Sequence, residues 1–287
     1  MKKRLAIIGF NDVGKFHCNE LRRSDEFDLV GVYCQKNSES FGRIKIYSDL
    51  NELFESADPE AIIITDGIQY LELFSKCVKT CKHIFIHHPI AKNTGAIHEM
   101  KYYSNLSGVM SVAGFFDRFN PVIVSLKKSL EREEKIYSIN ITRGFCLSRN
   151  LNLEILQNID LARFVAASDI AQFSKFEVHK EDKKNPTNTL CQLKMKNQTL
   201  VSIHNSINYP IDRFIIEVSA NSGIYFGDLI GMKLNKYTDY GQQNLKVDSD
   251  ISPIKKAHLE FFELCKNNKI NNLASLDDAL KVYEICV

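Results

Sequence analysis

Two glycines near the start of the chain stand where an apolar, strand-like run gives way to a helical pattern. They bound the segment Gly9-Phe-Asn-Asp-Val-Gly14. In a turn of this kind that binds a dinucleotide, the first glycine permits a tight bend and a later one permits close packing of helix on strand. The N–H groups at the start of the helix can then bind the pyrophosphate. The segment therefore indicates a phosphate-binding turn, with a turn that binds no ligand as the alternative.

The middle position of this turn departs from the usual pattern. A second glycine there normally lets the backbone approach the pyrophosphate, but the chain has Asn11. Asn tolerates left-handed backbone angles better than most residues do. Its Cβ would nevertheless stand between the backbone and a phosphate, so we expect the ligand to shift if it binds.

The end of the second strand-like run bears on the type of dinucleotide. Proteins that bind NAD usually place an acidic residue there, which hydrogen-bonds the ribose. The segment Tyr33-Cys-Gln-Lys-Asn-Ser38 offers none, and Cys34 stands near the expected position. Lys36, with Ser38, would suit a 2′-phosphate. This favours NADP, with NAD possible and Lys36 as a solvated loop residue the alternative.

Three histidines close together raise the question of a metal site. His83, His87 and His88 lie within one strand-like segment. On a strand His87 and His88 point to opposite faces, and no Cys or acid stands at the spacing of metal ligands. We therefore predict no metal.

Strand-like and helix-like patterns alternate over the first 120 residues, and these elements must position the residues described above. Short continuous apolar runs are typical of parallel strands buried on both faces. Their alternation with helical patterns predicts right-handed βαβ units and a doubly wound parallel sheet. The predicted strands are 4–8, 28–33, 61–65, 83–86 and 110–115, and the predicted helices are 13–23, 49–56, 69–80 and 94–103.

The pattern changes after Arg118-Phe-Asn-Pro121. Period-2 alternation and hairpin signals predict successive antiparallel strands, at 136–143, 174–179, 188–195, 200–206, 214–220 and 224–226. Helices are predicted at 122–131, 155–165, 253–267 and 276–285, the last capped by Ser275-Leu-Asp-Asp278. We predict an α/β protein with an N-terminal Rossmann domain over 1–118. A C-terminal α+β domain with a mostly antiparallel open-faced sheet follows over 119–287, its last helices able to pack back on the first domain.

Composition excludes several classes of protein. The 287 residues include 37 Lys and Arg against 35 Asp and Glu. This balance gives no electrostatic argument for nucleic acid or an acidic membrane. No apolar run approaches the roughly 18–20 residues of a membrane span, and the apolar stretch after the basic N-terminus is too short for a signal peptide. The eight cysteines are scattered without a CxxC pair, so we expect a reduced, cytoplasmic protein.

Several motifs, in this order and spacing, resemble the glucose–fructose oxidoreductase/inositol dehydrogenase (Gfo/Idh/MocA) family over nearly the whole chain. Cys81-Lys-His-Ile-Phe-Ile-His-His-Pro-Ile-Ala91 is similar to the family's GKHVLVEKPLA, and Gly114-Phe-Phe-Asp-Arg-Phe-Asn-Pro121 to its GFxxRFxP. Residues 212–223 resemble its RxxVxGxxG hairpin and residues 275–280 its closing helix. The resemblance implies an NAD(P)-binding Rossmann domain and hydride transfer on sugars, polyols or related small molecules. It also implies homo-oligomers through the C-terminal sheet.

The family's catalytic residues are replaced in this chain. Its lysine falls on His88, its histidine on Gln157 and the acidic partner of that histidine on Leu153. The turn after the 61–65 strand, usually Pro-Asn followed by His, reads Asp66-Gly67 with Tyr70. The related biliverdin reductases also lack the lysine and reduce a conjugated C=C/C=N system, so the replacement is compatible with an enzyme.

The resemblance assigns candidate roles to named residues. His88 would be the acid/base, because an ordinary pKa of about 6.5 suits proton transfer near neutrality; a packed or solvated strand-end histidine is the alternative. Tyr70 and Gln157 are further catalytic candidates, and Arg118 and Asp160 are candidates for contact with the substrate. The candidate cofactor-binding residues are Gly9, Asn11, Asp12, Val13, Gly14, Cys34, Gln35, Lys36, Thr65, Asp66, His87 and Pro89.

Two functions are compatible with these observations. The first is an NAD(P)-dependent oxidoreductase acting on a small polar or conjugated substrate. The second is a catalytically silent relative that binds a nucleotide or metabolite, or supports a partner protein. The replaced lysine, histidine and middle glycine favour the second, whereas the intact order of motifs and the available His88 favour the first.

Overall fold

The chain divides into two compact units. The computed structural model describes residues 1–35, 40–65, 69, 71–180 and 185–286. Unit 1 consists of residues 1–115 and 254–285, and unit 2 of residues 116–253 with Cys286. The ranges expected from the sequence put residues 254–285 in the second domain while allowing its helices to pack on the first. In the structure these residues are part of unit 1.

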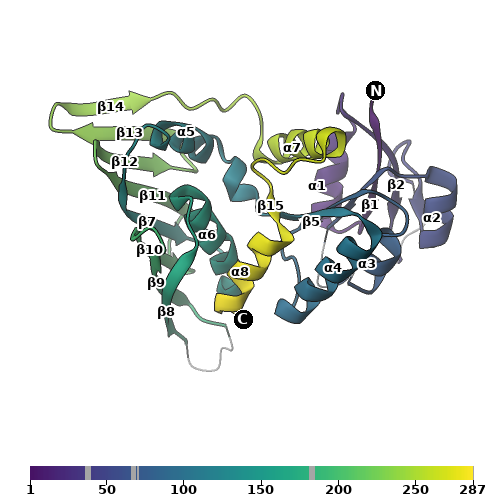
Figure 1. The fold of residues 1–287 in the computed structure, drawn as a ribbon, viewed down its shortest axis with the longest axis horizontal. Helices are drawn as coiled ribbons and strands as arrows, with labels where there is room; N and C mark the ends of the chain where they lie inside the picture. The colour runs from purple at the N-terminus through teal and green to yellow at the C-terminus, as the bar shows by residue number, and fades with distance from the viewer. Residues whose placement is uncertain (36–39, 66–68, 70, 181–184, 287) are drawn as a thin grey trace. The chain divides into compact units, whose positions relative to one another are not determined.

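Unit 1 is a doubly wound parallel sheet, as the alternation of elements predicts (Figure 1). Within the described residues seven strands lie in the order β15-β6-β5-β4-β1-β2-β3, and only β15 runs antiparallel to its neighbour. The chain moves from β1 to β2 in one direction and continues in the other from β4, so the strand order reverses between β1 and β4. The strands are β1 (Lys3–Ile8), β2 (Phe27–Tyr33), β3 (Ile46–Tyr47), β4 (Ala61–Ile64), β5 (His83–His87), β6 (Met110–Gly114) and β15 (Ala274–Ser275).

Helices cover both faces of this sheet (Figure 1). On one face, His17 of α1 and Phe261 of α7 both pack against Phe85 of β5, with ring centroids 6.2 and 5.6 Å away. Helices α3 and α4 pack together on the opposite face. The helices of unit 1 are α1 (Asp12–Leu21), α2 (Leu50–Ala57), α3 (Leu71–Cys77), α4 (Thr94–Ser107), α7 (Pro253–Asn267) and α8 (Leu276–Cys286).

Burial explains why short apolar runs form the central strands of unit 1. All four residues of β4 are buried, as are the last four of β1 and the first four of β5. Fully burying one such aliphatic side chain stabilises the fold by about 1.5–3 kcal/mol. Strands covered on both faces therefore read as continuous apolar runs, which is what the sequence shows.

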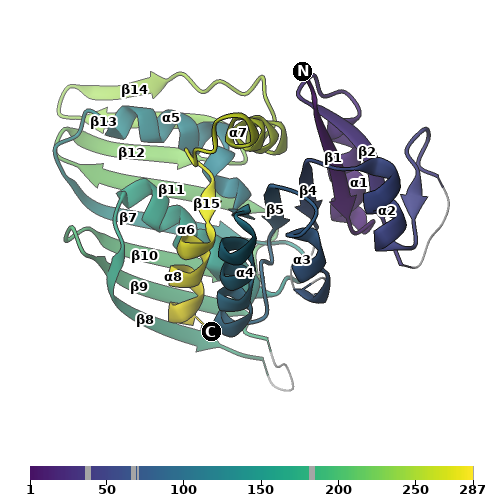
Figure 2. The same ribbon diagram turned by 45° about the vertical axis from the view of Figure 1, so that its right-hand side comes forward.

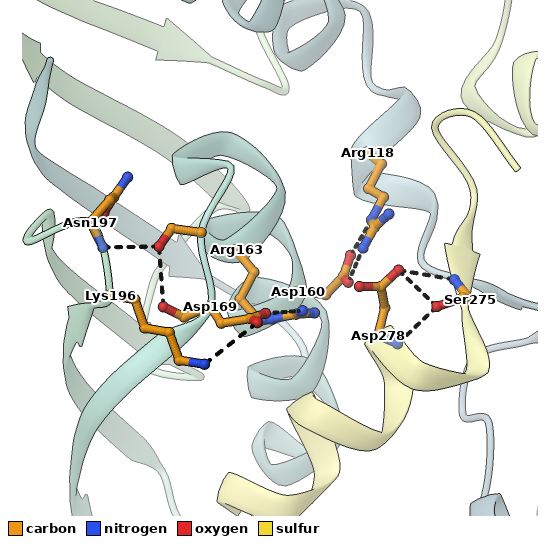
Figure 3. A network of polar contacts seen from close by, with 9 residues as sticks. Arg118, Asp160, Arg163, Asp169, Lys196, Asn197, Ser275 and Asp278 are labelled. Atoms are coloured by element: carbon orange, nitrogen blue, oxygen red, sulfur yellow. Dashed lines mark hydrogen bonds and ion pairs between the residues drawn. The ribbon is translucent and has the colours of Figure 1, made fainter.

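Asn and Asp residues fix where many of the helices begin. Each caps a helix by accepting a hydrogen bond from a backbone N–H in the first turn, which is worth about 1 kcal/mol. These caps are Asn11 for α1, Asp49 for α2, Asn93 for α4, Asn120 for α5 (Pro121–Leu130) and Asn150 for α6 (Leu151–Ala166). The predicted cap of α8 is confirmed, because Ser275 Oγ accepts from Asp278 N and Asp278 Oδ2 accepts from Ser275 N, each over 3.0 Å (Figure 3).

Unit 2 is a mostly antiparallel sheet with helices on one face (Figure 2). Eight strands, counted over the described residues, lie in the order β14-β13-β12-β11-β7-β10-β9-β8, and β7 and β10 are a parallel pair. Helices α5 and α6 lie against the same face of the sheet. The elements are η1 (Phe116–Phe119), α5 (Pro121–Leu130), β7 (Ile136–Gly144), α6 (Leu151–Ala166), β8 (Ile170–Val178), β9 (Asn188–Met195), β10 (Leu200–Ser206), β11 (Arg213–Ala220), β12 (Gly223–Asp228), β13 (Lys233–Thr238) and β14 (Gly241–Leu245).

The mixed sheet and the helices agree with the predicted fold class, but four strands were not predicted. β13 and β14 are dominated by polar residues, and Leu234 is buried while most of β14 is exposed, so they lack the apolar alternation that identifies a strand. β3 and β15 have two residues each and are too short for a periodic signal. Among the helices that the structure describes, none is long and apolar enough to cross a membrane.

Candidate functional site

The loop between β1 and α1 requires glycine at both predicted positions. Gly9 has φ +107°, a backbone angle that L side chains rarely adopt. Its N–H donates to Tyr33 O over 2.9 Å, which ties the loop to the end of β2. A Cβ on Gly14 would lie 2.2 Å from Gly9 O, so any larger residue would push the helix away from the turn. The first and third glycines of the pattern therefore have the structural roles that a dinucleotide-binding turn gives them.

Asn11, at the middle position of the turn, has a different conformation from the one that we expected. Its backbone is extended, with φ −74° and ψ −174°, so it does not use the left-handed angles that Asn tolerates. Its Oδ1 accepts a hydrogen bond from Gly14 N over 2.8 Å. The side chain is thus directed to the first turn of its own helix as the N-cap.

The other predicted residues of the nucleotide site that the structure describes follow the carboxyl ends of the strands or lie in the first turn of α1. Thr65, just after β4, is buried and donates from both N and Oγ1 to Ile8 O, over 3.0 and 3.2 Å. Cys34 is half-buried and Gln35 is exposed after β2. Asp12 is exposed and Val13 is half-buried at the start of α1. Lys36, Asp66 and Tyr70 lie outside the described residues.

A cavity of about 580 Å³ opens at the same end of unit 1. It is lined by residues that follow β4 and β5, including Gln69, Asn93 and Gly95. In open α/β sheets ligands bind outside the carboxyl ends of the strands. Such ligands bind where the strand order reverses, which here is between β1 and β4, whereas this cavity follows β4 and β5.

The end of β5 places His87, His88 and Pro89 at this edge of the sheet. His88 is buried, with its ring centroid 5.7 Å from that of Phe115. The segment that follows is held by Tyr283 of α8, whose hydroxyl accepts from Ile90 N over 3.2 Å. His87 and Pro89 are half-buried.

His87 belongs to a set of three interacting imidazoles that the sequence did not reveal. His17 Nδ1 lies 2.9 Å from His258 Nε2, and His17 Nε2 lies 3.0 Å from His87 Nδ1. Burial, followed by the proximity of the other rings, lowers the pKa of His17 well below 6.5. Burial lowers the pKa of His87 to about 4 and that of His258 to about 3, so the three rings are neutral at neutral pH.

The sequence offered little to predict this set. A single histidine on a predicted helix, such as His17, gives no indication of its partner. His258 stands 241 residues from His17. Across the residues that the structure describes, no group of three or more His, Cys, Asp or Glu side chains is arranged to hold a metal ion.

In unit 2 the predicted substrate residues Arg118 and Asp160 bind each other (Figure 3). Arg118 donates from Nε and Nη2 to the two carboxylate oxygens of Asp160, over 2.7 and 2.5 Å. Both side chains are buried, so each charge compensates the other. Gln157 lies on α6, half-buried. The structure thus assigns the Arg118–Asp160 pair a role in unit 2 itself, and contact with a substrate stays a prediction.

A second charged cluster in unit 2 escaped the sequence analysis. Arg143 Nη1 lies 2.8 Å from Asp117 Oδ2 and 3.5 Å from Glu154 Oε2. The guanidinium also lies 4.3 Å from the ring centroid of Phe214. Burial raises the pKa of Glu154. A carboxyl with a raised pKa in a mostly buried cluster is a functional candidate in its own right, and its position next to Leu153 was the only available signal.

Comparison with known proteins begins with the first unit. Residues 3–115 match a family model described as an oxidoreductase family with an NAD-binding Rossmann fold. The 4-carboxy-2-hydroxymuconate-6-semialdehyde dehydrogenase of Sphingobium sp. (strain NBRC 103272 / SYK-6) is 23% identical over 157 residues, which cover 52% of this chain. The match spans about half the length of that relative, 50%.

Solved structures match both units. A UDP-N-acetylglucosamine 3-dehydrogenase from Acidithiobacillus ferrooxidans has a TM-score of 0.88 at 13% identity, covering 99% of this chain and 95% of that one. An oxidoreductase from Agrobacterium radiobacter, solved in complex with NAD+, L-tartaric acid and magnesium, has a TM-score of 0.86 at 13% identity, covering 100% and 94%. At such low identity these likenesses establish the fold and leave the substrate open.

Proposed function

Because residues 3–115 match the Gfo/Idh/MocA oxidoreductase family, we propose that the chain is an NAD(P)-dependent oxidoreductase. Its substrate would be a small polar molecule such as a sugar or polyol, or a conjugated C=N or C=C compound. The coenzyme, when bound, supplies or accepts the hydride. The residues of this chain bind and orient the two reactants and move the accompanying proton.

The observation that carries this proposal is the geometry of the β1–α1 loop. Gly9 and Gly14 have the conformation and the close contact that a dinucleotide-binding turn needs, with φ +107° and no room for a Cβ, respectively. The side chain of Asn11 folds onto the N–H of Gly14. The N-terminus of α1 favours a negative charge, so these residues fit a pyrophosphate.

The residues after β2 favour NADP as the preferred coenzyme. Cys34 and Gln35 provide no carboxylate for the ribose hydroxyls that distinguish NAD. Without an acid there, a 2′-phosphate meets no like charge, and the neighbouring Lys36 would attract it. NADH should bind more weakly for the same reason.

His88 is our candidate for the acid/base of the reaction. It stands at the end of β5, at the carboxyl edge of the sheet, and its ring is held against Phe115. Oxidation of an alcohol needs a base for the hydroxyl proton, and such proton transfer contributes about 10²–10⁴-fold. Tyr70 and Gln157 would assist as further catalytic residues, and Arg118 and Asp160 would orient the substrate.

Coenzyme titration tests the first part of the proposal. Nicotinamide fluorescence of NADPH and NADH would be followed as protein is added, with NADPH expected to bind more tightly. Gly14→Ala should abolish binding because its Cβ has no space. Asn11→Gly, which removes the intervening Cβ, should strengthen it. Saturable binding of neither coenzyme would contradict the assignment.

Turnover under saturating coenzyme tests the second part. Sugars, polyols and conjugated imines would be screened, and His88→Ala should lower the rate about 10²–10⁴-fold. His98→Ala, at an exposed position of α4, is the matched control and should retain full activity. Unchanged activity of the His88 variant would remove His88 from the mechanism.

Binding without turnover would favour the alternative function. The family's lysine and histidine positions hold His88 and Gln157, which is compatible with a silent relative that binds a nucleotide or metabolite or supports a partner protein. Saturable NADPH binding with no reaction across the whole substrate panel is the outcome that supports this second candidate.

We also propose that the chain forms a homo-oligomer through the open face of the unit 2 sheet. This face carries a shallow cavity of about 540 Å³ on β7 to β10, and Leu200 is 57% exposed there. Light scattering should report an oligomer that Leu200→Lys dissociates. Ile211→Lys, at an exposed position outside the sheet, is the control. A monomeric wild-type protein would contradict the proposal.

A further inference from the structure

A line of three imidazoles crosses one face of unit 1. Its members come from three different elements: His258 from α7, His17 from α1 and His87 from the last position of β5. His17 is in the middle and contacts both neighbours through its two ring nitrogens, over 2.9 and 3.0 Å. His17 is fully buried and His258 nearly so, which separates these contacts from solvent.

The donor and acceptor roles in this line are linked. A neutral imidazole has one N–H and one bare nitrogen. If His17 donates to His87, its other nitrogen is bare and must accept from His258. If His17 instead accepts from His87, it must donate to His258. The three neutral rings therefore share one tautomer, with either Nε2–H throughout or Nδ1–H throughout.

Conversion between the two states moves one proton along the whole line. In the Nδ1–H state, a proton added at His87 Nε2 lets Nδ1–H of His87 pass to His17 Nε2. The Nδ1–H of His17 then passes to His258 Nε2, and His258, which is 5% exposed, releases its Nδ1 proton to water. One proton enters and one leaves, two shift within hydrogen bonds, and every ring is neutral before and after.

We propose that His258, His17 and His87 form a proton relay that exchanges protons between the ligand-binding edge of unit 1 and the α7 side of the sheet. Its outer end, His87, follows the buried part of β5 at the edge where the coenzyme is expected. The relay rests on the proposed function only for the reaction that it would serve. Alcohol oxidation releases one proton for each hydride transferred, and the relay would remove that proton from the site or return it for reduction.

Packing alone does not require this arrangement. Apolar rings of the same size would fill the space beside Phe85, as Phe261 already does. A metal site would need the ring nitrogens to converge on one point, whereas here they point pairwise at each other. Proton transfer through a buried ring needs a contact at each of its two nitrogens. His17 has such a contact with an imidazole on either side.

The first test uses the ring nitrogens of histidine-labelled protein without coenzyme. Long-range ¹H–¹⁵N correlation spectra distinguish an N–H nitrogen from a bare one and so identify each tautomer. We expect His17, His87 and His258 to share the same tautomer. Opposite tautomers in any contacting pair would overturn the proposal.

The second test is the rate at which the buried N–H proton of His17 exchanges with solvent. His258→Gln keeps an amide that can donate and accept but cannot pass a proton on, so exchange should slow about tenfold or more. A purely structural role predicts the reverse, because a weakened core opens more often. Exchange that is unchanged or faster would overturn the proposal.

Two further variants keep this test decisive. His87→Gln blocks the other end of the line and should slow the same proton if His258→Gln fails to fold. Asn268→Leu removes the 2.8 Å contact between Asn268 Oδ1 and His83, another histidine contact in unit 1 outside the line, and should leave the His17 rate unchanged. Because no coenzyme is present, failure of NADPH binding would contradict the proposed function and leave the relay result intact.

Discussion

The two units bury polar side chains in different ways. Among the residues that the structure describes, the buried polar side chains of unit 1 are histidines, serines and a threonine, whereas unit 2 buries asparagines, threonines and a serine together with the charged Arg118, Asp160 and Arg163. In unit 1 burial removes the charge from the imidazoles by lowering their pKa. In the Arg118–Asp160 and Arg163–Asp169 pairs of unit 2 the charges persist because each has a partner (Figure 3).

The difference determines how each unit responds to change. A neutral hydrogen-bonded set loses modest stability when one member is removed, but becomes sensitive to pH because its members must stay uncharged. A paired set of charges is insensitive near neutrality, but losing one partner leaves a buried charge. The predictions below test this contrast, beginning with the largest expected effect.

Breaking the buried ion pair of unit 2 should have the largest effect. Asp160→Asn removes the charge that compensates Arg118, and we expect it to lower the free energy of unfolding by about 3–5 kcal/mol. Urea unfolding followed by circular dichroism measures this. The double variant Arg118→Met with Asp160→Leu should recover most of the loss; an equal loss would show that the charges themselves are not responsible.

Acid should destabilise unit 1 before unit 2. The folded pKa values of His87 and His258, about 4 and about 3, lie below the value of 6.5 of unperturbed histidine. The unfolded chain therefore takes up protons first as pH falls. The stability that each ring contributes is complete above pH 6.5 and decreases by about 1.4 kcal/mol per pH unit below it, until the pH falls below the folded pKa of that ring.

Unit 2 provides the internal control for this titration. Although burial would raise the pKa of Glu133, hydrogen bonds from Ser222, Tyr225 and Lys236 lower it to about 2, against an ordinary value of 4.5. Its contribution is thus complete above pH 4.5. Amide hydrogen exchange at pH 5.5 should show weaker protection in unit 1 than at pH 7.5, with unit 2 unchanged. Equal loss in both units would contradict the contrast.

Removing the central imidazole should have an intermediate effect. His17→Phe keeps a ring against Phe85 but removes the contacts that His17 makes with His258 and His87. We expect a loss of about 1–3 kcal/mol, measured by thermal unfolding. The exposed His98→Ala should change stability by less than about 0.5 kcal/mol. A loss as large as that of Asp160→Asn would mean that neutral and charged sets are equally vulnerable.

The smallest effect should come from the helix caps, which are alike in both units. Asn11→Ala and Asn150→Ala each remove a side chain that accepts from the first turn of a helix. Each should cost about 1 kcal/mol. With saturating NADPH, the two variants should differ in thermal stability only if Asn11 also affects the binding of the coenzyme. A much larger loss at either cap without ligand would point to a role beyond capping.

Much of the fold could be predicted from the sequence because strand burial leaves a direct signal. The run Ala61-Ile-Ile-Ile64 cannot lie on a surface, and two-sided burial identifies it as a central parallel strand. β13 carried no such signal, because its buried Leu234 is surrounded by polar residues. β13 is a strand because it hydrogen-bonds to β12 and β14, and no local sequence pattern identifies these partners.

The site was predictable only where a local motif defines it. Gly9 and Gly14 could be assigned because their spacing reflects one turn of backbone. The contact between His17 and His258 depends on which faces of α1 and α7 meet over the sheet, and the sequence does not encode this locally. Arg118 and Asp160 were placed in a site through their motif, but nothing in the motif showed that they bind each other.

The return of residues 254–285 to unit 1 has a consequence for how the protein is made. Residues 116–253 emerge from the ribosome before the segment that finishes the first sheet, so unit 2 has its full complement of residues earlier. The first 115 residues wait for β15, α7 and α8, and until then the Phe85 side of the sheet lacks its Phe261 cover. A chain truncated at any point after residue 253 would therefore leave unit 1 incomplete, although the first 115 residues of that unit are synthesised first.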